Sequence, residues 1–253
     1  MSALLNLPRL FFVISLVILW LAAVTGASFR KRALEEDERD DLNMILAATL
    51  TLLGLIIGFT FSMAVSRYDQ RKNYEETEAN AIGTEYVRAD LLPADNATKV
   101  RALLRDYLNQ RVLFYEARDK QRLQQVNAYT EQLQTEMWSA VAAPAKAEPT
   151  PLVALAVAGM NDVLNSQGYT QAAWWNRIPA AAWGLMMAIA VGCNLMVGYS
   201  ARRTKGHPIL FLVLPLVVSI SFFLIVDIDS PRTGVIRVHP QNLVSLAQSL
   251  QAH

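Results

Sequence analysis

The sequence has few of the side chains from which metal and redox sites are built. Its 253 residues include one cysteine, Cys193, and three histidines. A single cysteine cannot form a disulfide within the chain, and so small a Cys and His content excludes a Cys/His metal cluster. We therefore predict neither a metal site nor a cofactor.

Motifs that carry catalysis are also missing. The chain has no Walker loop, GxSxG, HExxH, CxxC or dinucleotide fingerprint. The three histidines, His207, His239 and His253, are scattered over predicted loops and the tail. No nucleophile is paired with a base, so we predict no enzyme and no catalytic residue. A net charge of +1 gives no support for a nucleic-acid partner.

Asp, Glu, Lys and Arg are absent from four long apolar runs, at residues 10–28, 42–65, 178–199 and 209–226. Because the hydrocarbon core of a bilayer is about 30 Å thick, a helix needs about 20 apolar residues to cross it. The runs predict four transmembrane helices in a lipid bilayer. The first run is longer than a signal-peptide core and is followed by Arg-Lys-Arg, so we predict that it is retained.

The chain shows no strand pattern and no internal repeat. We predict an all-α integral membrane protein with four transmembrane helices and a helical extramembrane domain inserted between helices two and three. The predicted parts are a first hairpin at 1–65, the extramembrane domain at 66–177, a second hairpin at 178–226 and a C-terminal tail at 227–253.

The segment after the second run stays helical in pattern. It predicts one continuous helix of roughly 50 residues, ended by Pro93. Asp95 or Asn96 is then expected to cap a helix over 98–137 that breaks near 118–120. We expect a Pro-containing linker at 143–151 and a short packed helix at 152–167.

Three tryptophans, Trp174, Trp175 and Trp183, lie near the start of the third run. Tryptophan prefers the boundary between membrane and water, so the cluster predicts an interface there.

The second run carries the most pattern. Gly54, Gly58, Ser62 and Ser66 recur every four residues, a spacing that lets helices approach closely. The roughly opposite side has Thr49, Ile56, Thr60, Met63 and Arg67. In one interpretation, this side lines a pore around an oligomer axis. In the other, both sides contact helices of the same bundle, and the threonine hydroxyls donate to carbonyl groups of their own helix.

Charged residues gather where the second and fourth runs end. Arg67 and Arg71 form a cationic ring at a channel mouth, clamp lipid headgroups, or are ordinary interfacial arginines. Asp227 and Asp229 are best explained as acidic partners of these arginines, which would lock the two spans. An ion site and a polar helix end are the alternatives for the two aspartates.

Three segments together resemble a known family: RYDQR, EANAIGTEYVRADLLP and DIDSPRTGVIRV. The chain resembles the bacterial bestrophin-like membrane proteins, which are remotely similar to bestrophins, pentameric anion channels whose second span lines the pore. The resemblance implies a homo-oligomeric, anion-conducting channel and a pentamer. It places the constriction near Ile56, Phe59 or Met63. The calcium-binding acidic cluster of animal bestrophins is not found.

The EANAIG segment also suggests how the long helix packs. Its small residues Ala79, Ala81 and Gly83 predict close helix contact, either around a shared axis or within the chain's own domain.

Two arguments bear on which side of the membrane the inserted domain occupies, and they disagree. Seven Lys and Arg residues flank the spans on each side, and their higher density in the short loops places those loops in the cytoplasm. The resemblance instead implies a cytoplasmic inserted domain with both termini inside the cell, in an inner membrane, and we adopt it. The alternative function is a membrane-anchored scaffold or sensor whose helical domain binds a partner.

Overall fold

A computed structural model describes residues 7–29, 35–201 and 210–251, and every element in these ranges is a helix. The prediction of an all-α fold is confirmed. The elements are α1 (Pro8–Phe29), α2 (Glu36–Arg88), the 3-10 turn η2 (Ala89–Leu91), α3 (Ala94–Glu116), α4 (Lys120–Ala147), α5 (Pro151–Trp175), α6 (Ala180–Ser200), α7 (Leu210–Asp229) and α8 (Gln241–Gln251).

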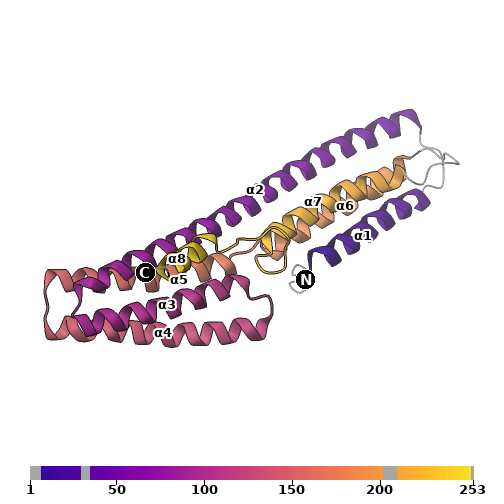
Figure 1. Ribbon diagram of the computed structural model, residues 1–253. Helices are drawn as coiled ribbons and strands as arrows, with labels where there is room; N and C mark the ends of the chain where they lie inside the picture. The colour runs from indigo at the N-terminus through magenta and orange to yellow at the C-terminus, as the bar shows by residue number, and fades with distance from the viewer. Residues whose placement is uncertain (1–6, 30–34, 202–209, 252–253) are drawn as a thin grey trace. The chain divides into compact units, whose positions relative to one another are not determined.

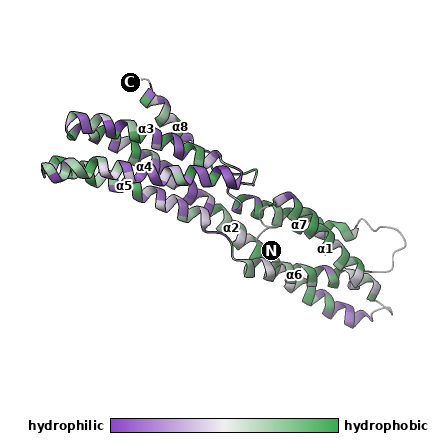
Figure 2. Cartoon of the chain, turned by 90° about the horizontal axis from the view of Figure 1, so that it is seen from below, coloured by the Kyte–Doolittle hydropathy of each residue, from purple (hydrophilic) through white to green (hydrophobic). Residues whose placement is uncertain are grey.

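Four helical stretches among the described residues are long and apolar enough to cross a membrane, as predicted. Figure 2 shows hydrophobic colouring along α1, α6 and α7. The fourth stretch lies in α2, which runs unbroken for 53 residues (Figure 1). This confirms the predicted continuous helix. α2 ends at Arg88 and is followed by η2, which stops at Leu91, shortly before Pro93, whose ring disfavours helix in the preceding residue.

The chain divides into two compact units, which are described separately. Unit 1 contains the described residues of Met1–Ser66 and Arg177–Arg237, and unit 2 those of Arg67–Asn176 and Val238–His253.

In unit 1, α1 packs against α6 and α7. Gly26 of α1 and Gly198 of α6 allow the backbones to touch, because a Cβ at either position would overlap a carbonyl oxygen of the facing helix. Phe11 and Trp183 meet edge to face with ring centroids 5.3 Å apart, next to Phe222. These contacts form a tight bundle from helices that are far apart in sequence.

In unit 2, α3, α4 and α5 pack around one apolar core together with the outer part of α2 and α8. The predicted periodic residues of α3 supply much of it, including Val100, Leu104, Tyr107 and Leu108. The predicted break between α3 and α4 is confirmed at residues 117–119.

Several boundaries differ from the sequence prediction. The structure begins α3 at Ala94 with Pro93 as its N-cap, so Asp95 and Asn96 lie in its first turn and do not cap it. The predicted linker is mostly helix, because α4 continues through Pro144, whose ring is buried, to Ala147. The short packed helix extends to Trp175 as α5, and α8 was not predicted.

The three tryptophans near the start of the third run differ in burial. Trp174 is buried against Phe114 and Tyr115 in unit 2, and Trp183 is buried against Phe11 in unit 1. Only Trp175 of the three is exposed. Core packing buries two of the rings, and their position at a membrane boundary stays a prediction.

Candidate functional site

The membrane part of α2 is largely uncovered within one chain. Only 11% of its most apolar 18-residue window is buried, against 33% for α1 and 44% for α7. Most of this surface is therefore left for lipid or for other copies of the chain.

The predicted pore residues of α2 differ in how far they are exposed. Phe59 and Met63 are exposed, at 65% and 46%, whereas Thr49 and Ile56 are half-buried. Thr60 is buried, and its hydroxyl donates to the Ile56 carbonyl oxygen at 2.7 Å. Thr49 likewise donates to carbonyls of its own helix. The threonine hydroxyls are thus satisfied locally, as one of the two interpretations expected.

The small residues of the second span face open space in a single chain. A Cβ at Gly54 or Gly58 would meet no described atom within 4 Å, and Ser62 is exposed. Close packing on these residues therefore requires another molecule. The intrachain backbone contacts use Gly26 and Gly198, which the sequence analysis did not single out.

A regular repeat of uncharged positions runs along α2, which the sequence analysis missed. Its positions are spaced alternately four and three residues apart and are exposed or half-buried, and we call them the α2 seam: Ile45, Thr49, Leu52, Ile56, Phe59, Met63, Ser66, Gln70, Asn73, Thr77, Asn80, Thr84 and Val87. A spacing averaging 3.5 residues drifts by about 20° every seven residues around a straight helix, and it is typical of helices that supercoil around a common axis.

The outer half of the seam has an unusual composition. From Ser66 to Val87 it has hydroxyl, amide and apolar side chains but no charge. The neighbouring exposed positions Asp69, Lys72 and Glu76 are all charged. An ordinary solvated helix face would carry such charges, so their absence from the seam indicates a surface with a separate role.

Three of the charged residues at the predicted mouth, Arg71, Asp227 and Asp229, have defined hydrogen-bond partners. Arg71 is 1% exposed, and its Nε donates to the Arg67 carbonyl oxygen at 3.1 Å. Asp227 accepts hydrogen bonds from the backbone N–H groups of Val235 and Ile236, both at 2.8 Å.

Asp229 accepts from the Ile178 N–H at 3.2 Å and pairs with Arg177 at 3.5 Å. The two aspartates therefore organise the chain before α6 and the turn after α7. Their pairing with Arg67 and Arg71 stays a prediction.

The outer part of α2 buries acidic side chains that tie unit 2 together. Glu75 binds the start of α8, accepting from the Leu243 N–H at 3.0 Å and from the Asn242 amide at 2.6 Å. A carboxylate at a helix N-terminus satisfies an unpaired N–H and favours the helix dipole. The EANAIG segment also packs here, since Gly83 faces the Leu246 side chain.

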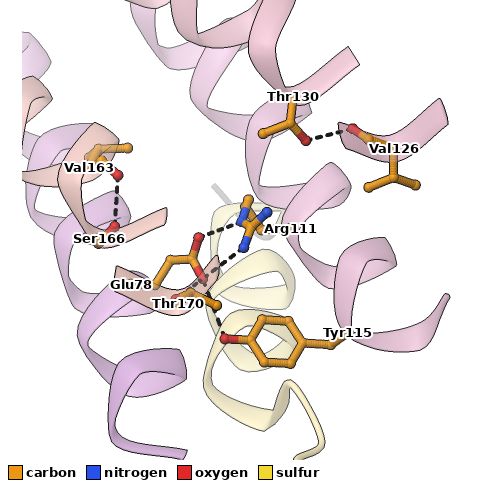
Figure 3. Close-up of polar contacts among 8 residues, drawn as sticks. All are labelled: Glu78, Arg111, Tyr115, Val126, Thr130, Val163, Ser166 and Thr170. Carbon is orange, nitrogen blue, oxygen red and sulfur yellow. Dashed lines mark hydrogen bonds and ion pairs between the residues drawn. The ribbon is translucent and has the colours of Figure 1, made fainter. Parts of the chain in front are cut away.

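Glu78 is the centre of a buried network (Figure 3). It pairs with Arg111 of α3, Nε to Oε1 at 2.5 Å, with both side chains fully buried. The hydroxyls of Thr170 and Tyr115 donate to Glu78 Oε2 at 3.3 and 3.5 Å.

Burial alone would lower the pKa of the Arg111 guanidinium, but Glu78 outweighs it and raises that pKa above its ordinary value. Burial, and then Glu78, raise the pKa of the Tyr115 hydroxyl. The network is a charged clamp joining α2, α3 and α5.

Comparison with known proteins decides the family. A model of the bestrophin-like domain matches residues 9–243. The chain belongs to the bestrophin-like family. Bacterial bestrophin homologues from Klebsiella pneumoniae share its fold: a variant with one leucine changed to threonine, at 12% identity, has a TM-score of 0.67 over 95% of this chain and 98% of that one. A second structure of the Klebsiella homologue, also 12% identical, has a TM-score of 0.66 over 96% of both chains.

A further solved structure, described as a membrane protein with one proline changed to alanine, is 11% identical with a TM-score of 0.67, covering 95% of this chain and 97% of that one. No curated protein matches the chain. At these identities the solved structures establish the fold of this bestrophin-like membrane protein.

Proposed function

We propose that this bestrophin-like chain forms a homo-oligomeric ion channel in which the α2 seam surrounds the ion path. The observation that carries the proposal is the uncharged, exposed outer half of the seam, between Ser66 and Val87. Exposed apolar residues inside the membrane can contact lipid or line a pore, so the argument for an ion path rests on the part of the seam outside the membrane. A stripe of hydroxyls and amides outside the membrane suits an aqueous path.

The proposal extends into the membrane along the same spacing. There the seam contains Thr49, Ile56, Phe59 and Met63 of the predicted pore set, while Thr60 lies off it and is buried. Anion preference and a pentamer rest on the family resemblance, and Arg67 beside Ser66 would add a basic ring at the mouth. Gly54, Gly58 and Ser62 would then face neighbouring subunits or lipid. We place the inserted domain in the cytoplasm of a cell whose inner membrane holds the spans.

Ion flux and assembly test the channel directly. The full chain, purified and reconstituted in liposomes, should form a ring-like oligomer and release chloride. Met63→Ala should change the flux by about threefold or more, because it widens a constriction lined by apolar side chains. Met44→Ala is the matched control, since Met44 is exposed on the same helix but off the seam. A folded monomer that passes no ions would overturn the proposal.

A membrane-anchored scaffold is the second candidate. Unit 2 has a core of its own and exposes two aromatic rings on α4, Tyr129 at 42% and Trp138 at 41%. Such rings are common anchors in protein interfaces. This function predicts that the folded, oligomeric chain passes no ions at all, which separates it from the channel.

A further inference from the structure

Glu85 differs from the other buried acids of α2. Its side chain is fully buried, yet neither carboxyl oxygen has a hydrogen-bond partner among the described residues. Glu75 and Glu78 of the same helix are both well bonded. Glu85 lies against Gly159 of α5, where a Cβ would overlap Glu85 Oε2 and crowd Arg88 Nη1. The missing side chain at Gly159 makes the space in which these two groups lie.

The charges around Glu85 come from two helices. Burial raises the pKa of Glu85 from its ordinary 4.5 to about 8, Arg88 opposes the rise, and Asp162 of α5 adds to it. Tyr169 of α5 is the other titratable group in the adjoining groove, and Asp90 of η2 is paired with Arg101. The carboxyl is therefore protonated at neutral pH, which agrees with its lack of a partner.

Arg88 lies at the edge of two grooves beside the seam. The first, of about 410 Å³, is shared with α5 and includes Thr84, Asp162 and Ser166. The second, of about 560 Å³, is shared with α8 and includes Asn242 and Leu246. Asn80 and Thr84 of the seam line both grooves. Among the described residues, Arg88 is the one basic side chain lining these two grooves, and Asp162 is the acidic one in the first.

We propose that Glu85 and Arg88 form a proton-operated switch on the outer part of α2. When Glu85 is protonated, Arg88 leaves its positive charge in the grooves. When Glu85 loses its proton, the buried carboxylate closes an ion pair with the guanidinium that already lies next to it beside Gly159. Residues three apart on a helix are neighbours, so this requires only a change of side-chain conformation. An unpaired buried carboxylate is costly, and the pairing relieves that cost.

The switch cancels one positive charge beside the grooves of every chain as the pH rises. Within the proposed channel, this would weaken the attraction of the outer path for anions. That consequence rests on the proposed function, whereas the pairing itself does not.

Infrared spectroscopy of the full chain between pH 6 and 10 tests the pairing without reference to conduction. A protonated carboxyl band should disappear with a midpoint of about 8. The spectrum of Glu85→Gln should lack this carboxyl band. Arg88→Met should move the midpoint upward, because it removes an attractive charge, and Asp162→Asn should move it downward, because it removes a repulsive one. A band that Glu85→Gln leaves in place, or a midpoint that Arg88→Met does not raise, would overturn the switch.

Thermal unfolding supplies a second readout. The folded state holds the Glu85 proton up to about pH 8, whereas the unfolded state releases it near 4.5. The wild type should therefore lose melting temperature relative to Glu85→Gln as the pH rises from 4.5 to 8, and the difference should level off above 8. Gly159→Ala should shrink this dependence by displacing the carboxyl from its site. A wild type and a Glu85→Gln variant with parallel pH profiles would contradict the proposal.

Conduction provides the third readout, which depends on the channel as well. The wild type should lose anion preference as the pH rises through about 8, and Glu85→Gln should keep it. If the infrared shifts appear and no ions pass, the switch stands and the channel fails. If ions pass and the infrared shifts are absent, the channel stands and the switch fails.

Discussion

Arg111→Met is expected to destabilise the protein by about 3–5 kcal/mol, because it leaves Glu78 buried without its charged partner. Both side chains are fully buried, so neither water nor solvent ions can replace the lost guanidinium. The same substitution also removes the stacking of Arg111 over the Phe114 ring, 4.4 Å from the guanidinium carbon to the ring centroid. Urea unfolding of the full chain in detergent, followed by far-ultraviolet circular dichroism, measures the loss.

The matched control is Arg101→Met. Arg101 also pairs with an acid, Asp90, but these side chains are 32% and 65% exposed. An exposed pair contributes only about 0.2–1 kcal/mol. If Arg111→Met and Arg101→Met proved equally mild, the network around Glu78 would not be the clamp described above.

Thr77→Glu is expected to lower chloride flux by about tenfold or more, because it puts a ring of negative charge around the proposed ion path. Thr77 is exposed in the outer seam, where it contributes to the groove beside α5. Thr77→Lys should act in the opposite direction and strengthen anion preference. Reversal potentials in planar bilayers, recorded under a chloride gradient, measure both effects.

The control changes more charge at a position outside the seam. Lys72→Glu alters the charge by two units on an exposed residue of the same helix. Under the proposed geometry it should affect selectivity less than Thr77→Glu does. A larger effect at Lys72 would place the ion path on another face of α2.

Hydropathy and periodicity were sufficient to predict most of the architecture. The uncharged runs located the membrane helices, and the absence of proline up to Pro93 predicted the continuity of α2. These features depend on local chemistry and on the thickness of the bilayer, so sequence reasoning reached them.

Features that depend on tertiary contacts were missed. The short helix α8 is fixed by the Glu75 carboxylate and by burial of Leu243, neither of which is readable from the tail itself. Pro144 lies inside α4, and its ring is buried within unit 2, a tertiary contact that the sequence does not reveal. From its position in the sequence, Trp183 showed no sign that aromatic rings of α1 and α7 bury it.

The pore-lining residues of α2 stay a prediction. Thr49, Ile56, Phe59 and Met63 fall on the seam, whereas Thr60 was assigned to the same side by helical angle and is buried. The alternating spacing of uncharged residues was visible in the sequence. Its significance became clear only once Glu75, Glu78 and Glu85 were seen to be buried on another side of α2.

Cysteine accessibility along α2 tests the central claim most directly. In a Cys193→Ala background, single cysteines would replace seam residues such as Met63, Asn73, Thr77 and Thr84, and off-seam residues such as Leu55, Lys72 and Glu76. A charged thiol reagent applied during conduction should block current at the seam positions, at intervals of three and four residues, and leave the others unaffected. Block at Lys72 and Glu76 with none at Asn73 and Thr77 would contradict an ion path along the α2 seam.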